Sequence, residues 1–163
     1  MTNDNDAILA AMSRMPDAGW ITMQEQELAK FEQSGSTESL AFEVDGQSRR
    51  VVLVTMRGAK TGQPRRIALM RIEAGGTYAV VASKGGSLKA PAWYHNLIAN
   101  PDVRLQDERT TNAYRAREVT GAERELWWKR GVEVHPQFEY YATRADRVIP
   151  VLVLEPVGGS EKK

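Results

Sequence analysis

Short runs of alternating apolar and polar residues fill the chain from residue 40 to residue 154 and predict β-strands. The runs are rich in Val, Ile, Leu and Tyr, and turn residues such as Asp45-Gly46 and Gly75-Gly76 separate them, as in antiparallel hairpins. The seven predicted strands are 40–44, 50–56, 66–72, 77–83, 103–106, 111–119 and 148–154. Pro150 lacks an amide hydrogen, so it places the last run at a sheet edge or at the start of a strand. Seven strands in this length predict a barrel or a sandwich.

The first forty residues show the period of helices instead. Over residues 8–15, apolar side chains recur at i, i+3, i+4 and i+7 until Pro16 ends the run. Thr22 and Glu25 have the spacing of a capping box, which predicts that a second helix begins there. The Ser/Gly stretch 34–37 is expected to be a linker. We therefore predict an acidic helical extension over 1–38, a barrel domain over 39–157 and a flexible tail over 158–163.

Two more predicted helices interrupt the strands. Pro91 suits a first helical position, and Asn100-Pro101 ends that segment. The other helix is expected to begin at Thr120, where Glu123 gives a second capping box. The predicted architecture is a mainly β fold with helices (α+β), in which the helices pack outside an antiparallel barrel.

The charges nearly cancel in sum but not along the chain. The 163 residues suffice for one domain, and 22 Lys and Arg stand against 21 Asp and Glu. Residues 1–46 contain nine acids and two bases, a net charge of −7, so residues 47–163 carry +8. The overall balance argues against nucleic-acid binding, whereas the split leaves a basic body that can hold an anionic ligand.

Several classes of protein are excluded by composition. The chain has no cysteine, which removes disulfides, thiol nucleophiles and thiolate metal sites, and its two histidines are too few for a zinc site. Apolar runs of six or seven residues are far below the ~20 needed to span a bilayer, and no signal peptide is recognisable. A cytoplasmic protein without a metal is expected, and a monomer is favoured.

The turn over residues 57–66 is the first candidate binding element. It contains two glycines, the hydroxyl of Thr61 and four cations, a mixture that binds phosphate or carboxylate groups through backbone amides and side chains. The cations are Arg57, Lys60, Arg65 and Arg66. It is not a Walker A loop, since Val54 and Ala59 stand where glycines are required. An ordinary solvated hairpin turn remains the alternative.

A second candidate follows the strand over 77–83. Ser83 and Lys84 precede Gly85-Gly86, and paired glycines let successive amides converge on an anion beside the lysine charge. Glycines that simply make a turn are the alternative.

Aromatic and polar side chains in two later segments complete the candidates. Trp93 is expected to face the core, whereas Asn96 would need hydrogen-bond partners that a planar heterocycle can supply. His95 is either a proton donor or, more commonly, an exposed helix histidine. Phe138 and Tyr141 lie at i, i+3 and would either wall an apolar pocket or pack on the barrel.

Four blocks of the sequence together resemble the deazaflavin-dependent nitroreductase family, whose members use reduced coenzyme F420. The blocks lie within residues 51–156 and are 58–65, 82–86, 91–97 with 99–101, and 146–151. The resemblance implies a split β-barrel of the flavin-reductase type with six or seven antiparallel strands. It also implies that these residues contact the cofactor: Arg57, Lys60, Thr61, Arg65, Ser83, Lys84, Gly85, Gly86, Trp93 and Asn96. By the same resemblance Met70, His135, Phe138 and Tyr141 line the substrate pocket.

Two departures from the family pattern mark this chain. Ala59 replaces an arginine of the first loop, and Arg57 or Arg66 is expected to compensate. His135 and Phe138 stand where related nitroreductases carry tyrosines, which leaves Tyr141.

The reaction implied by the resemblance is hydride transfer from the reduced deazaflavin to an activated alkene, a quinone or a nitro-heterocycle. Ser83 and Tyr141 are the candidates to hydrogen-bond or protonate the developing anion. The alternatives are an FMN-dependent oxidoreductase on the same barrel and a non-catalytic carrier of a cofactor or lipid. The N-terminal helices would cover the barrel, close the pocket or dock on a membrane that contains quinones, although their −7 charge opposes anionic lipid.

Overall fold

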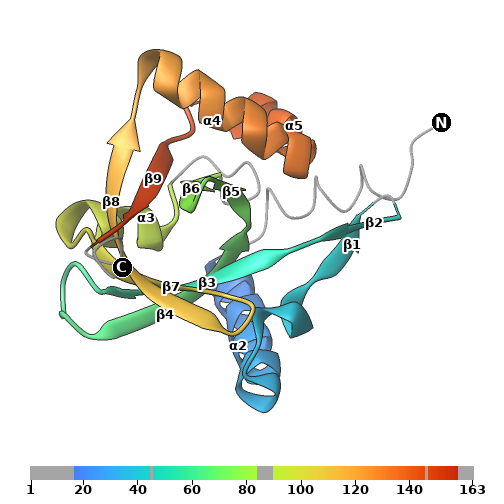
Figure 1. Ribbon diagram of the computed structural model, residues 1–163, viewed down its shortest axis with the longest axis vertical. Helices are drawn as coiled ribbons and strands as arrows, with labels where there is room; N and C mark the ends of the chain where they lie inside the picture. Colours follow the sequence, from blue (N-terminus) through green and yellow to red (C-terminus); the bar gives the residue numbers. More distant parts are fainter. Residues whose placement is uncertain (1–16, 45, 84–89, 146, 158–163) are drawn as a thin grey trace.

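The computed structural model describes residues 17–44, 46–83, 90–145 and 147–157, and one curved antiparallel sheet dominates them (Figure 1). The seven strands of the sheet, in spatial order, are β4 (Pro64–Met70), β3 (Val51–Arg57), β7 (Asp102–Asp107), β8 (Thr110–Val119), β9 (Val151–Pro156), β6 (Thr77–Val81) and β5 (Ile72–Ala74). The predicted mainly β fold with seven antiparallel strands is therefore confirmed.

The sheet curls into a split barrel because its two edges are almost continuous in the chain. Only Arg71 separates the edge strands β4 and β5, and its amide donates to the carbonyl of Arg50 over 3.0 Å. Of the two alternatives that Pro150 suggested, the sheet edge is wrong, because β9 pairs with β8 on one side and β6 on the other. The start of a strand is close to the observed position, since β9 begins at Val151. Pro150 precedes the strand, so it removes no amide from the ladder, and its carbonyl accepts from the amide of Ala82.

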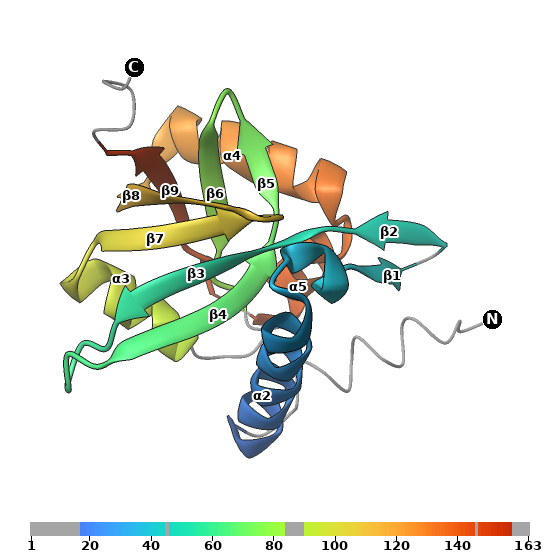
Figure 2. The ribbon, with the colours of Figure 1, turned by 60° about the horizontal axis from the view of Figure 1, so that its bottom comes forward.

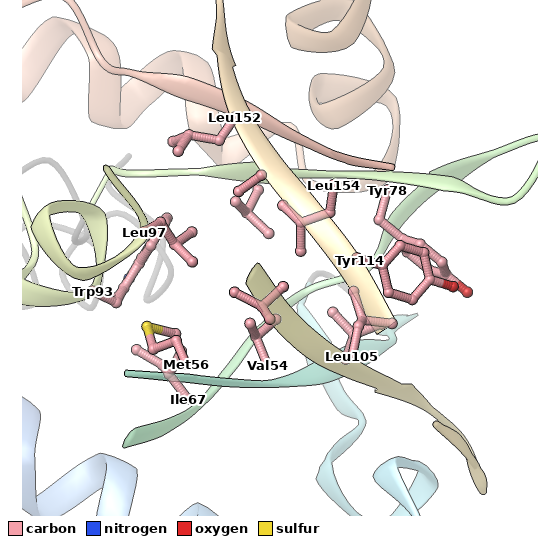
Figure 3. Close-up of a cluster of buried hydrophobic side chains, with 14 of the residues drawn as sticks. Val54, Met56, Ile67, Tyr78, Trp93, Leu97, Leu105, Tyr114, Leu152 and Leu154 are labelled. Atoms are coloured by element: carbon pink, nitrogen blue, oxygen red, sulfur yellow. The ribbon is translucent and has the colours of Figure 1, made fainter. Parts of the chain in front are cut away.

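Strand alternation produces two separate hydrophobic clusters. On β9, Leu152 and Leu154 point into the barrel, whereas Val151 and Val153 point outward beneath two helices. Figure 3 shows the inner cluster, in which side chains from six strands meet those of the helix α3 (Ala92–Ala99). The outer cluster lies under α4 (Gly121–Val134) and α5 (Gln137–Ala145), which cover the outer face of the sheet (Figure 1).

The predicted capping box at the start of α4 does not form. Thr120 is the N-cap residue, as expected, but its side chain makes no capping hydrogen bond. Glu123 instead binds Arg117, with a shortest contact of 2.6 Å between a carboxylate oxygen and Nη2. A charged partner on β8 therefore replaces the backbone amide that a capping box would offer.

Among the described residues, four elements precede the barrel: α2 (Asp17–Ser34), the 3-10 helix η1 (Thr37–Leu40), and the hairpin of β1 (Phe42–Val44) and β2 (Gln47–Arg49). The helix begins at Asp17, so the prediction of a start at Thr22 is wrong; no proline interrupts the segment from 17 to 34. The helix expected over 8–15 lies outside the described residues.

The segment over 34–37 is attached to the barrel rather than acting as a free linker. The amide of Thr37 donates to the carbonyl of Glu108 over 3.1 Å, and its hydroxyl accepts from the amide of Glu108 over 2.6 Å. Gln106 also donates to the carbonyl of Gly35. A domain boundary at residue 38 remains a prediction. In the part of the chain that the structure describes, no helix is long and apolar enough to cross a membrane.

Candidate cofactor and substrate site

The loop between β3 and β4 has a defined hydrogen-bonded shape. At its base the amide of Gly58 donates to the carbonyl of Gln63 over 2.8 Å, and the amide of Gly62 donates back to the carbonyl of Gly58 over 2.9 Å. Gly62 adopts φ of 72°, in the left-handed region that favours glycine. The turn therefore favours the glycine at position 62, and Figure 2 shows the loop projecting from the barrel.

Helix α3 braces this loop. The Oδ1 atom of Asn96 accepts a hydrogen bond from the amide of Ala59 over 2.9 Å. The sequence argument that Asn96 needs a partner is correct, but the protein itself supplies a partner to Oδ1. The contact explains why Asn96 and the loop belong to one site although 37 positions separate Asn96 from Ala59.

The cations of the loop divide into paired and unpaired groups. Arg66 forms an ion pair with Glu32 at 2.9 Å and lies over the ring of Phe31. Arg57, Lys60 and Arg65 are exposed, and none forms an ion pair with a carboxylate of the described residues. Of the two residues expected to compensate for Ala59, Arg57 is therefore the one with a free charge.

Trp93 and His95 lie on opposite sides of α3. Trp93 is 6% exposed and packs in the inner cluster (Figure 3), as the core interpretation predicts. Its contact with a cofactor stays a prediction. His95 is exposed and its ring meets that of Tyr94 at 5.2 Å, which agrees with the commoner alternative of a surface histidine.

Ser83 ends the segment that continues β6. It is 6% exposed, and by strand alternation it lies on the face of Val81, toward the outer cluster and α5. The guanidinium of Arg147 donates to the carbonyls of Ala82 and Ser83 at 3.1 and 3.2 Å and so fixes this strand end. Lys84, Gly85 and Gly86 lie outside the described residues.

The four predicted pocket residues meet in the outer cluster. Phe138 and Tyr141 belong to it and their ring centroids are 6.1 Å apart, while Met70 packs against it from β4. The ring of His135 lies 5.0 Å from Phe138 and 5.7 Å from Tyr141. The β1–β2 hairpin adds Phe42, whose ring contacts His135 at 6.5 Å.

Burial controls the protonation of His135 and Tyr141. Desolvation, and then the positive charge of Arg49, lowers the pKa of His135 to about 4. Desolvation also raises the pKa of Tyr141 to about 12. Both side chains are therefore neutral near pH 7, and His135 Nε2 lies 3.3 Å from the hydroxyl of Tyr141.

Sequence reasoning missed Arg49. Its side chain is 4% exposed at the end of β2 and lies close enough to His135 to affect it electrostatically. Gln47-Ser48-Arg49-Arg50 is a polar run that predicts an exposed strand end, so no signal in the sequence marks a buried arginine.

The donor set of the loop fits an anionic cofactor tail. Phosphodiester and carboxylate groups need cations and amides that are not already paired, and Arg57, Lys60 and Arg65 provide such cations beside a braced turn. Among the residues that the structure describes, no group of His, Asp and Glu is arranged to hold a metal ion.

Comparison with known proteins places the chain in a family. The family model for F420H(2)-dependent quinone reductase matches residues 26–156, and the chain belongs to that family. An F420H(2)-dependent quinone reductase of Mycobacterium tuberculosis is 35% identical over 123 residues, which cover 74% of this chain and 82% of the relative.

Two solved structures extend the comparison. An F420-H2 dependent reductase, FDR-A, is 50% identical with a TM-score of 0.62 and covers 64% of this chain and 93% of its own. A structure described as a domain-swapped dimer is 40% identical with a TM-score of 0.63, covering 86% of this chain and all of its own. The preference for a monomer therefore finds no support among these relatives.

Proposed function

We propose that this protein reduces quinones with reduced coenzyme F420. The observation that carries the proposal is the braced β3–β4 loop, in which Arg57, Lys60 and Arg65 have no carboxylate partner among the described residues. Elsewhere exposed arginines such as Arg115 and Arg117 are paired with carboxylates. A loop that keeps three cations free is suited to an anionic ligand.

The cofactor-binding residues are proposed in two groups. Arg57, Lys60 and Arg65 would pair with the phosphodiester and carboxylates of the tail, and Thr61 would add a hydroxyl. Ser83 and the predicted Lys84-Gly85-Gly86 amides would lie along the rest of the cofactor, with Trp93 and Asn96 behind it. When bound, the reduced coenzyme supplies a hydride.

The chain's own part in the reaction is to position the acceptor and stabilise charge. Met70, Phe138 and Tyr141 provide apolar and aromatic surface for a flat quinone ring. Because burial raises its pKa to about 12, Tyr141 remains a hydroxyl group at neutral pH and can donate a hydrogen bond within the site. Ser83, on the same face of the sheet, is the second proposed donor.

A fluorescence titration with coenzyme F420 tests the proposal. Lys60→Ala and Arg65→Ala should each weaken binding about fivefold to tenfold, because each removes one exposed charge-assisted contact worth about 1 kcal/mol. Arg115→Ala is the matched control, since it removes the same charge from an exposed arginine paired with Asp102 on β7. The control should bind as wild type does.

Three results would contradict the proposal. Equal weakening in Arg115→Ala would show that only net charge matters. Tight binding of FMN without binding of coenzyme F420 would favour the flavin enzyme, and ligand binding with no turnover of any acceptor would favour a carrier.

A further inference from the structure

Arg49 is a buried cation without a compensating charge among the residues that the structure describes. Its side chain is 4% exposed, and no carboxylate among the described residues pairs with it. Its Nη1 atom donates to the Oε1 atom of Gln47 over 3.2 Å, while its Nε atom is buried and has no partner. A buried and uncompensated charge costs several kcal/mol, so this position is expected to serve a ligand rather than the fold.

His135 offers a second unpartnered nitrogen close to this charge. The side chain is 5% exposed and its Nδ1 atom has no hydrogen-bond partner. Its Nε2 atom is occupied by the hydroxyl of Tyr141 at 3.3 Å. The two side chains lie in the same region, because Phe42 pairs with Arg49 across the β1–β2 hairpin and its ring centroid lies 6.5 Å from that of His135. Each is more than nine-tenths buried and leaves one polar atom unpaired.

Counting donors indicates which nitrogen of His135 carries the proton. If Nε2 donated to Tyr141, the buried tyrosine hydrogen and the Nδ1 lone pair would both lack a partner. If Tyr141 donates to Nε2, only the hydrogen on Nδ1 lacks one. Since each unpaired buried group costs about 1–3 kcal/mol, the second arrangement is favoured. His135 and Arg49 then both present unpaired N–H donors.

We propose that Arg49 and His135 bind the quinone oxygen on which negative charge develops, and that Tyr141 holds His135 in the donating tautomer. This inference rests on the proposed function. A quinone that gains a hydride, two electrons and one proton, becomes a hydroquinone monoanion, and a second proton from water completes the hydroquinone. A fixed guanidinium and a neutral imidazole N–H stabilise the monoanion before that proton arrives.

The inference assigns different roles to the two cationic regions. The exposed loop cations hold the cofactor tail, whereas Arg49 responds to charge on the acceptor. Arg49 is always charged, and a desolvated charge acts on its ligand more strongly than an exposed one. Phe42 and Phe138, which contact His135, shield it from water on two sides.

The test uses the full chain without cofactor and two quinone probes. The probes are 2-hydroxy-1,4-naphthoquinone, an anion near pH 7, and the neutral 2-methyl-1,4-naphthoquinone, and quenching of tryptophan fluorescence reports binding. Wild type should bind the anion more tightly. Arg49→Met should lose that preference by about tenfold or more while changing affinity for the neutral probe little. Arg104→Met, at an exposed position on β7, is the charge-matched control and should keep the preference.

Thermal unfolding separates this role from a structural one. Arg49→Met should melt at the same temperature as wild type or higher, because an uncompensated buried charge is replaced by an apolar side chain. Retention of the anion preference in Arg49→Met would overturn the inference. It would mean that Arg49 contacts a buried water, or nothing, rather than the quinone. A lower melting temperature with unchanged probe binding would overturn the inference as well.

The outcome is also distinguishable from failure of the proposed function. If coenzyme F420 fails to bind but the anion preference depends on Arg49, the subsite stands and the cofactor assignment falls. If the coenzyme binds through the loop and Arg49→Met changes neither probe, the reductase assignment stands and the subsite falls.

Discussion

At the scale of single residues, His135 has two neighbours that the sequence predicts and one that it does not. Sequence resemblance places it in a substrate pocket, and the structure does bring it to Phe138 and Tyr141. No pattern in the sequence shows that Arg49 lies near it, because that proximity depends on the contact of the β1–β2 hairpin with His135 through Phe42. Arg49 and His135 are 86 positions apart, and local periodicity does not predict contacts over such a separation.

The low pKa of His135 predicts acid sensitivity. Its pKa is about 4 in the folded protein against an ordinary 6.5, so the unfolded chain takes up a proton first as the pH falls. The stabilisation is complete above about pH 6.5 and is lost between about pH 6.5 and about pH 4, by about 3 kcal/mol in all.

Urea unfolding between pH 7 and pH 4 measures this effect. His135→Gln should show a shallower loss of stability than wild type over that range. His95→Gln is the matched control, since His95 is the exposed histidine, and it should follow wild type. An equal slope in wild type and His135→Gln would contradict the prediction.

The hydroxyl of Tyr141 is predicted to act on the reacting quinone through His135, because it holds that imidazole in the tautomer that donates from Nδ1. Tyr141→Phe removes the donor and leaves the ring packed against Phe138, so the fold should persist. We expect kcat for quinone reduction to fall about tenfold to a hundredfold while affinity for coenzyme F420 is unchanged. Steady-state kinetics with reduced coenzyme F420 measure both, and undiminished activity would remove Tyr141 from the proton path.

At the scale of elements, alternation of apolar residues predicts the strands well because one face of each strand is buried. The runs over 50–56 and 111–119 correspond to β3 and β8 within one or two residues. Helix starts are predicted less well: Thr22 lies inside α2, and Thr120 caps α4 without a side-chain hydrogen bond. A capping pattern identifies residues able to cap, and competing partners decide whether they do.

The brace between α3 and the β3–β4 loop gives an element-scale prediction. Asn96→Ala removes the acceptor for the amide of Ala59, so that amide should exchange faster with solvent even without ligand. The global stability should fall by only about 1 kcal/mol, since the amide can bond to water. Affinity for coenzyme F420 should fall with the loss of loop order.

Amide hydrogen exchange and cofactor titration on the same variant test this prediction together. His95→Ala, on the exposed side of the same helix, should change neither quantity. Weaker cofactor binding with unchanged exchange at Ala59 would mean that Asn96 contacts the ligand directly rather than bracing the loop.

At the scale of the whole molecule, the barrel has a polar network that involves the last residue of β7. Asp107 accepts hydrogen bonds from Tyr78 at 2.6 Å and Arg71 at 2.8 Å, and the Asp107 carboxylate contributes to raising the pKa of Tyr78 after burial itself. These three residues join β7, β6 and the single residue between β4 and β5. The network therefore holds the split barrel at the point where its edges meet.

Removing Asp107 should destabilise the fold without changing the hydrogen bonds of the β3–β4 loop. Asp107→Ala removes the hydrogen-bond partner of Tyr78 and leaves Arg71 only its longer ion pair with Glu73 at 3.8 Å, so we expect a loss of about 2–4 kcal/mol in the free energy of unfolding. Asp102→Ala is the control, because its pair with Arg115 is exposed and worth less than about 1 kcal/mol. Denaturant unfolding measures the stability of both variants. Equal losses would contradict the conclusion that Asp107 holds the two barrel edges together.

The charge pattern of the whole chain is clearer in the folded protein. Glu32 from the acidic N-terminal part neutralises Arg66, one of the four loop cations, and leaves three without a carboxylate among the described residues. The sequence shows an acidic segment and a basic body, but only the packing of α2 beside β4 shows which cation is paired with a carboxylate. The concentration of cations in the β3–β4 loop is visible in the sequence, whereas the division between paired and unpaired cations is not.

The central claim is reduction of a quinone by reduced coenzyme F420, and steady-state turnover tests it most directly. The protein is supplied with reduced coenzyme F420 or with reduced FMN, and 2-methyl-1,4-naphthoquinone is the acceptor. Our account predicts saturable, protein-dependent oxidation of the deazaflavin, with a higher KM for it in Lys60→Ala and an unchanged KM in Arg115→Ala. Turnover with reduced FMN alone, or no turnover with either donor, would contradict it.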